Sequence, residues 1–217
     1  MMLSFVWDLI TMMLNSCEVK ERDINQNVMY ENMIQTYQKI TQLKVLTLFL
    51  DDPYTSCYLR ESARMLDMDP MTIKRSLDIL VKDEFLIKYE EKNRILYQAN
   101  LENPALRYLK ISYNLSWLQE KNLVEFITSK MKSVTSIMLF GSFAKGENDE
   151  NSDIDIVIIS QSKDKPTAEL TNLLNKDVNL LNFTPAQWSN QSKKNRAFYL
   201  DVIIDGVLLY GTKPVVE

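Results

Sequence analysis

Residues 139–159 read LFGSFAKGENDENSDIDIVII and hold the most informative pattern in this 217-residue chain. An apolar run ends at Gly141-Ser142, ten residues follow, and Asp153-Ile154-Asp155 opens a second apolar run. Side chains alternate along a strand, so Asp153 and Asp155 should share a face, with Cα atoms about 7 Å apart. Gly141 lets the backbone turn closely, and the amides after it suit phosphate oxygen. The pattern predicts two carboxylates that hold a divalent cation, Mg²⁺ or Mn²⁺, beside a phosphate-binding turn.

This string resembles the nucleotidyltransferase signature of the DNA polymerase β superfamily, in which Gly-Ser precedes Asp-hydrophobic-Asp by roughly nine to thirteen residues. More narrowly, it is similar to the minimal nucleotidyltransferases over most of residues 134–211. The resemblance implies an enzyme that moves a nucleoside monophosphate from an NTP to an acceptor hydroxyl, with Mg²⁺ as cofactor. By that match the triphosphate is held by Gly141 and Ser142, and the catalytic metal ligands are Asp153 and Asp155.

The superfamily places a third carboxylate on the next strand, where this chain reads KDVNLLNFT at residues 176–184. Asn179 is expected at that position. An amide coordinates metal weakly and accepts a proton poorly, so catalytic power should be reduced even if nucleotide and metal still bind. Asp177 has the same strand parity and is the alternative third acid. Lys145, in the first turn after Ser142, is expected to neutralise phosphate or else to be a solvated surface lysine.

The C-terminal part, residues 133–217, alternates strand and helix patterns and predicts an α/β domain with a mixed sheet. The expected strands cover residues 134–140, 153–159, 178–184 and 207–211. The expected helices cover residues 166–176, a segment starting at Pro185, and 196–204.

Residues 37–100 predict three helices followed by a hairpin, which is the pattern of a winged helix-turn-helix. The expected helices run from Tyr37 to Leu50, from Ser56 to Leu66 with Thr55 as cap, and from Pro70 to Lys82 with Asp69 as cap. Residues 93–110, NRILYQANLENPALRYLK, are similar to the wing and following helix of archaeal winged-helix proteins fused to nucleotidyltransferase domains.

That second resemblance implies binding of double-stranded DNA, with the third helix in the major groove. The candidate DNA-binding residues are Thr72, Lys74, Arg75, Ser76, Lys92 and Arg94. Residues 55–97 contain eight basic and eight acidic residues, which gives this segment a net charge of zero, whereas dedicated DNA binders are usually basic. Winged helices also serve as protein-binding or dimerisation modules, so a partner protein and a homodimer stay open.

Two further segments complete an α+β chain. Residues 101–132 predict a helical connector, with a break expected at Asn114–Ser116. Residues 1–36 predict a helical extension whose apolar positions from Leu3 to Leu14 have helical spacing. This apolar stretch is too short to span a bilayer and follows no basic residue, so neither a membrane span nor a signal peptide is expected.

The bulk composition excludes several classes of site. The chain has no histidine, which excludes a Ser-His-Asp triad and any histidine-bearing metal site. Its two cysteines, Cys17 and Cys57, are too few for a thiolate zinc site and are expected as free thiols in the cytoplasm. The net charge of -4 provides no overall field that attracts nucleic acid.

Two functions therefore compete at the level of sequence. The first is a metal-dependent nucleotidyltransferase with an unidentified acceptor. The second is a DNA-binding transcriptional regulator, or an antitoxin-like partner-binding protein, whose nucleotidyltransferase domain is catalytically degenerate. The intact Asp153/Asp155 pair favours the first, and Asn179 with the winged-helix pattern favours the second.

Overall fold

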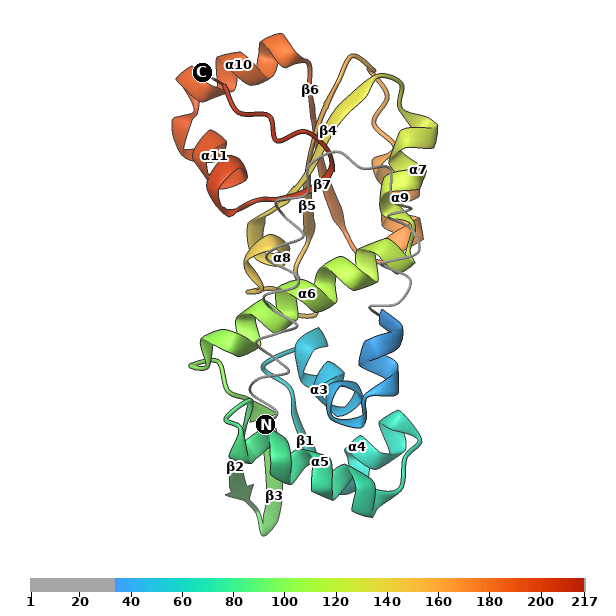
Figure 1. Cartoon of the computed structure of the whole chain (residues 1–217), viewed down its shortest axis with the longest axis vertical. Helices are drawn as coiled ribbons and strands as arrows, with labels where there is room; N and C mark the ends of the chain where they lie inside the picture. The colour runs from blue at the N-terminus through green and yellow to red at the C-terminus, as the bar shows by residue number, and fades with distance from the viewer. Residues whose placement is uncertain (1–33, 217) are drawn as a thin grey trace.

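The computed structural model describes residues 34–216, which form an N-terminal unit and a C-terminal unit joined by one long helix (Figure 1). The expected helix near the N-terminus and Cys17 lie outside the described residues. Tyr37, within a helical stretch at residues 34–39, is buried in the core of the N-terminal unit.

The N-terminal unit combines helices with a small antiparallel sheet of order β1-β3-β2. Its elements are α3 (Thr41–Asp51), β1 (Ser56–Tyr58), α4 (Leu59–Leu66), α5 (Pro70–Lys82), β2 (Leu86–Glu91) and β3 (Arg94–Ala99). The start of α5 is as predicted: Pro70 occupies the first turn, and the Asp69 carboxylate accepts a 2.9 Å hydrogen bond from the Thr72 amide. The β2–β3 hairpin is also as predicted.

The predicted helix over Ser56–Leu66 is wrong in its first three residues. Ser56–Tyr58 form strand β1, which pairs antiparallel with β3, and α4 begins only at Leu59. Thr55 therefore caps no helix; Tyr58 stands at the N-cap position and makes no side-chain cap hydrogen bond. The cause is non-local, because Cys57 lies opposite Tyr97 and both are buried.

Helix α6 (Pro104–Glu120) crosses between the two units and belongs to both cores. Leu106 and Leu109 pack in the core of the N-terminal unit, whereas Leu118 packs in the core of the C-terminal unit. The predicted break at Asn114–Ser116 is wrong, because the helix continues through these residues to Glu120. Asn114 is buried there and uses its amide in tertiary hydrogen bonds rather than to end the helix.

The C-terminal unit is a mixed four-stranded sheet of order β6-β5-β4-β7, in which only the β5–β6 pair is parallel. The mixed sheet confirms the prediction. Its strands are β4 (Val134–Phe140), β5 (Ile154–Ser160), β6 (Val178–Phe183) and β7 (Val207–Gly211). Its helices are α7 (Leu123–Lys130), α8 (Gly141–Lys145), α9 (Thr167–Leu174), α10 (Pro185–Lys194) and α11 (Arg196–Leu200).

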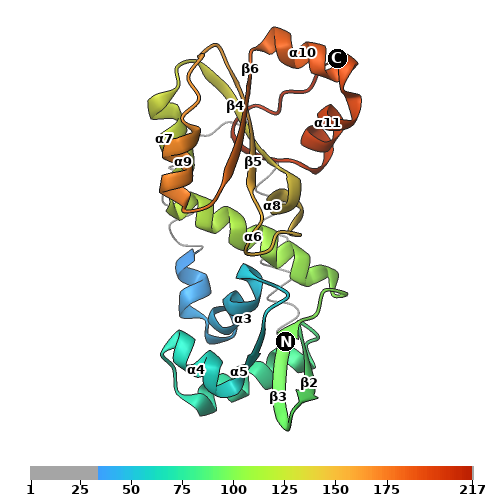
Figure 2. The same cartoon turned by 180° about the vertical axis from the view of Figure 1, so that it is seen from behind.

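The helices cover both faces of this sheet. Helices α7 and α9 lie on one side, and α10 and α11 lie on the other (Figure 2). Successive residues of a strand serve opposite sides, since Ile156 and Ile158 pack with α7 and α9 while Val157 and Ile159 pack with α10 and α11. The short helix α8 lies against α6 at the end of the sheet nearest the N-terminal unit.

Two helix predictions need correction in this unit. The expected helix over 196–204 is α11 followed by a π-helical turn, η2 (Asp201–Asp205), and the expected helix over 166–176 covers only Thr167–Leu174. The π-turn fits the tight exit at Gly206, where a Cβ atom would lie 2.2 Å from the Val202 carbonyl oxygen. Helix α9 ends because Asn175 adopts a left-handed conformation with φ of 51°.

None of the helices in residues 34–216 has the length and apolar character needed to cross a membrane.

Candidate nucleotide and metal site

The two halves of the Gly-Ser and Asp-Ile-Asp pattern meet at one end of the sheet. Phe140, the last residue of β4, pairs with Asp155 in β5. Gly141 follows with φ of +68°, and a Cβ atom there would lie 2.2 Å from the Asp155 Oδ2 atom. A side chain at this position would meet the Asp155 carboxylate and would need a left-handed backbone, so glycine is favoured here.

The strand alternation assigns the polar residues to one face. Asp155 has the parity of Val157 and Ile159, so it lies on the side covered by α10 and α11. Asp153 lies just before the first residue of β5 and is exposed. Ser142, in the first turn of α8, is half-buried. The Gly-Ser turn and both acids thus lie at the same end of the sheet, where β4 ends and β5 begins.

Asn179 lies directly beside Asp155. The two residues are partners in the parallel β5–β6 ladder, and the Asn179 Nδ2 group donates a 2.9 Å hydrogen bond to Asp155 Oδ1. Asp177 precedes β6, and its backbone carbonyl accepts a 2.9 Å hydrogen bond from the Ile154 amide. The residue next to the Asp155 carboxylate is consequently an amide and not an acid.

The environment of Asp155 favours its protonated form. Partial burial raises the pKa of this carboxyl group, the hydrogen bond from Asn179 lowers it, and the charges of Asp153 and Asp201 raise it further. A carboxylate that is half-buried among other acids is stabilised by a bound cation. This is the electrostatic character expected at a metal position.

Lys145 does not project freely toward a phosphate position. Its ammonium group pairs with Asp201 at 2.5 Å and with Asp205 at 3.5 Å. The hydrogen bond with Asp201 and the charges of both acids raise the pKa of Lys145. These two partners leave one N–H donor of the ammonium group for a phosphate oxygen, and the two acids offset its positive charge.

Sequence reasoning did not find Asp201 and Asp205. They lie on η2, 56 and 60 residues beyond Lys145, and no local pattern connects them to the Gly-Ser motif. Their spacing of four residues, which can place two side chains on one helical face, was the available signal.

Helix α6 holds the Gly-Ser turn from outside the motif. The Arg107 guanidinium donates a 2.6 Å hydrogen bond to the Lys145 carbonyl and pairs with Glu147 at 3.3 Å. The Asn114 amide donates to the Phe143 carbonyl at 3.0 Å and to Asn148 Oδ1 at 2.8 Å. The connector therefore fixes both the helix after Gly141 and the loop that leads to Asp153.

Replacement of Asn114 by Ala should destabilise the protein by about 1–3 kcal/mol, because it leaves the Phe143 carbonyl and the Asn148 side chain buried without this partner. Chemical denaturation monitored by fluorescence measures the loss. Ser116→Ala is the matched control, since Ser116 is equally buried on α6 but bonds only within the helix, to the Ser112 carbonyl. A larger loss for Ser116→Ala would contradict the role given to Asn114.

The side chains at this edge fit a hard divalent cation. Mg²⁺ is commonly bound by one or two protein carboxylates, with substrate phosphates and water completing the octahedron. Asp153 and Asp155 meet that requirement. Within residues 34–216, no group of three His, Cys, Asp or Glu side chains is placed to hold a metal ion.

The candidate DNA-binding residues are placed unequally on the N-terminal unit. Lys74, Arg75, Lys92 and Arg94 are exposed, whereas Thr72 is half-buried and donates its hydroxyl to the Asp69 cap. Ser76 is only 2% exposed, and its hydroxyl bonds the Thr72 carbonyl at 3.1 Å. Ser76 thus faces the core. Because its side chain is buried, it is not placed to contact DNA.

Comparison with known families gives a match over residues 120–207 to the nucleotidyltransferase domain family. That stretch contains α8, the Asp153/Asp155 pair and Asn179, so the match to the nucleotidyltransferase domain family covers the candidate site. No curated protein matches the chain.

Among solved structures, similar chains occur in toxin–antitoxin complexes. One was solved with AMP-PNP; it is 23% identical with a TM-score of 0.35, and the match covers 43% of this chain and 74% of that one. Another, a mutant of the MntA–HpeT toxin–antitoxin, is 21% identical with the same TM-score and the same coverage of both chains.

Proposed function

We propose that the C-terminal unit is a metal-dependent nucleotidyltransferase that moves a nucleoside monophosphate from an NTP to an acceptor hydroxyl and releases pyrophosphate. The observation that carries this proposal is the contact between Gly141 and Asp155. It brings a turn suited to phosphate against a carboxylate suited to a divalent cation, and an accidental pair of solvated aspartates would not need a residue without a side chain there.

Each residue has a role in this proposal. Gly141 and Ser142 bind the triphosphate through backbone amides and a hydroxyl. Asp153 and Asp155 hold Mg²⁺ or Mn²⁺, which when bound neutralises charge on the phosphates and on the transferring group. Asn179 orients the Asp155 carboxylate through its amide hydrogen bond. It is a poor proton acceptor, so activation of the acceptor is expected to be weak.

The direct experiment is incubation of the full chain with labelled NTPs, Mg²⁺ or Mn²⁺, and a lysate that supplies acceptors. A labelled product that requires the metal and disappears in Asp153→Ala supports transfer. If no NTP labels any product under either metal while the protein still binds nucleotide, the domain is a nucleotide sensor and the enzyme proposal is wrong.

Asn179→Asp should convert the site to the three-acid pattern of the superfamily. Because the new carboxylate lies beside Asp155, we expect tighter Mn²⁺ binding and faster transfer, together with a lower melting temperature without metal from charge repulsion. Isothermal titration and differential scanning fluorimetry, each with and without Mn²⁺, measure these effects. Asn172→Asp, at an exposed asparagine of α9, is the matched control and should change neither.

We further propose that the chain is divided as the sequence indicates, into a winged helix-turn-helix at 37–100, a connector at 101–132 and the transferase domain at 133–217. The helix–strand–helix–helix–strand–strand order of the N-terminal unit and its capped α5 support the first assignment. Its proposed partner is double-stranded DNA. A regulator without transfer activity is the second candidate function, and the amide at Asn179 is the observation that favours it.

A further inference from the structure

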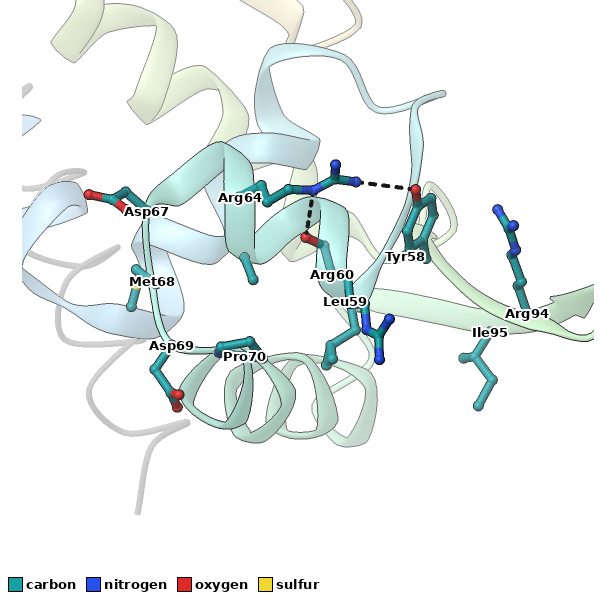
Figure 3. A pocket seen from close by; sticks show the side chains of 11 residues that line it. Tyr58, Leu59, Arg60, Arg64, Asp67, Met68, Asp69, Pro70, Arg94 and Ile95 are labelled. Atoms are coloured by element: carbon teal, nitrogen blue, oxygen red, sulfur yellow. Dashed lines mark hydrogen bonds between the residues drawn. The ribbon is translucent and has the colours of Figure 1, made fainter.

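An open groove on the N-terminal unit lies between α4, the turn that connects α4 to α5, and the start of β3 (Figure 3). Three arginines, Arg60, Arg64 and Arg94, line it together with Tyr58. We call this set the arginine groove. The fold brings it together from two separate stretches of the chain, residues 58–70 and 94–95, and only Arg94 belongs to the DNA-binding residues expected from the sequence.

Tyr58 holds two of the arginines in place. The Arg64 Nη2 group donates a 3.3 Å hydrogen bond to the Tyr58 hydroxyl, and the Arg64 Nε group donates to the Arg60 carbonyl at 3.3 Å. On the other side, the Arg94 guanidinium lies 5.5 Å from the centroid of the Tyr58 ring, within cation–π range. Tyr58 thus contacts two guanidinium groups, that of Arg64 through its hydroxyl and that of Arg94 through its ring.

The positive charge of the groove is not neutralised by ion pairs. The ion pairs found in residues 34–216 include none of the three arginines. Two acids also line the groove, but Asp69 is engaged as the cap of α5, and both Asp67 and Asp69 project at the end away from Tyr58 and Arg94 (Figure 3). Although residues 55–97 have a net charge of zero, the end of the groove that holds Tyr58 and Arg94 is therefore positively charged.

All three arginines are exposed, and within residues 34–216 no carboxylate forms an ion pair with any of them, so an anion in the groove would meet guanidinium groups whose charge is not neutralised. Guanidinium is planar and carries donors in a fork that matches phosphate oxygens. The Tyr58 ring lies beside Arg94, its hydroxyl accepts from Arg64, and no other aromatic residue lines the groove. Single-strand binders stack successive bases on several aromatic rings, which this groove does not offer. The groove is accordingly suited to the backbone of a duplex rather than to single-stranded nucleic acid.

We propose that the arginine groove binds the sugar–phosphate backbone of double-stranded DNA, with Arg60, Arg64 and Arg94 contacting phosphate oxygens. The proposal rests on the DNA-binding role proposed for the N-terminal unit and names the surface that carries it. The groove and α5 together then define the bound face, with Lys74 and Arg75 as neighbouring exposed cations.

The test is fluorescence anisotropy of the full chain with labelled duplex DNA of mixed sequence, at several salt concentrations. Each lost phosphate contact should reduce the slope of log K against log salt by about 0.9, so combined Arg60→Gln, Arg64→Gln and Arg94→Gln should reduce it by about 2.7. Tyr58→Phe should weaken binding less, since it keeps the ring beneath Arg94. Arg196→Gln, an exposed arginine on α11, is the matched control and should bind like the wild type.

These measurements distinguish duplex DNA from other ligands of the groove, and they test DNA binding separately from nucleotidyl transfer. Unchanged affinity and slope in the triple variant, with an unchanged melting temperature, would overturn the proposal, as would an absence of duplex binding by the wild type at low salt. Stronger binding of single-stranded DNA or of an acidic polypeptide would also overturn it. Nucleotidyl transfer is measured on the same samples, so its failure is recognised independently of the groove.

Discussion

Asp155→Asn should reduce nucleotidyl transfer by about 10³-fold, in line with the loss of one main electrostatic group at a reacting phosphate. The amide keeps the shape of the side chain and can still accept the hydrogen bond from Asn179, but it removes the charge that holds the cation. Labelled-NTP transfer assays at saturating Mg²⁺ measure the rate. Glu169→Gln is the control, because Glu169 is an exposed acid on α9, which covers the opposite face of the sheet, and should not affect the rate.

The same substitution should not destabilise the protein in the absence of metal. Burial raises the pKa of Asp155 in the folded state, so its ionised form opposes folding at neutral pH, and that opposition disappears as the pH falls through the raised pKa. A neutral amide removes this opposition at every pH. We therefore expect the melting temperature of Asp155→Asn to equal or exceed that of the wild type at pH 7. A clear loss of stability would indicate a structural role for the carboxylate.

Gly141→Ala is the second substitution with a large expected effect. The residue must adopt a φ of +68°, which opposes folding by about 1–3 kcal/mol for a residue with a side chain. The new methyl group would also meet the Asp155 carboxylate, so the turn and the acid have to separate. We expect loss of both Mn²⁺ binding and transfer, measured by titration calorimetry in the presence of a non-hydrolysable NTP.

Gly211→Ala distinguishes this local effect from general destabilisation. Gly211 also has a left-handed backbone, with φ of +78°, and a Cβ atom there would lie 2.0 Å from the Thr135 carbonyl oxygen. It belongs to the far end of β7, away from Asp155. Both variants should melt earlier, but only Gly141→Ala should lose the metal. Equal losses of metal binding would contradict the account.

The parts of the site that follow from local pattern were predictable from the sequence. Gly141 and Asp155 lie in one motif, and the resemblance to the superfamily indicated Asn179 as the residue beside the acid, whereas strand parity alone left Asp177 as an alternative. The mixed sheet followed from strand and helix patterns of the C-terminal part. The role of Asn179 in catalysis stays a prediction.

The predictions from the sequence failed where contacts between segments far apart in the chain determine the local structure. Ser56–Tyr58 became a strand because β3, some 40 residues later, provides its partner, and local propensity did not reveal that pairing. Lys145 is paired with acids that lie far along the chain, on a π-helical turn. Asn114 was read as a helix breaker, although its buried amide links α6 to the loop before Asp153. The arginine groove likewise combines segments that have no common sequence pattern.

Helix α6 gives the two proposed functions a physical connection. Its first turns pack in the core of the N-terminal unit, and its side chains hold the Gly-Ser turn through Arg107 and Asn114. A family match that starts at residue 120 leaves these supports out. We expect a fragment that begins there to lack the turn geometry of the full chain.

Anomalous scattering at the manganese edge, from crystals of the full chain grown with Mn²⁺ and a non-hydrolysable NTP, tests whether Asp153 and Asp155 hold a metal ion beside the triphosphate. We expect a manganese peak within coordination distance of both Asp153 and Asp155, with the triphosphate against Gly141 and Ser142. A nucleotide bound elsewhere, or a manganese ion that contacts neither aspartate, would contradict it.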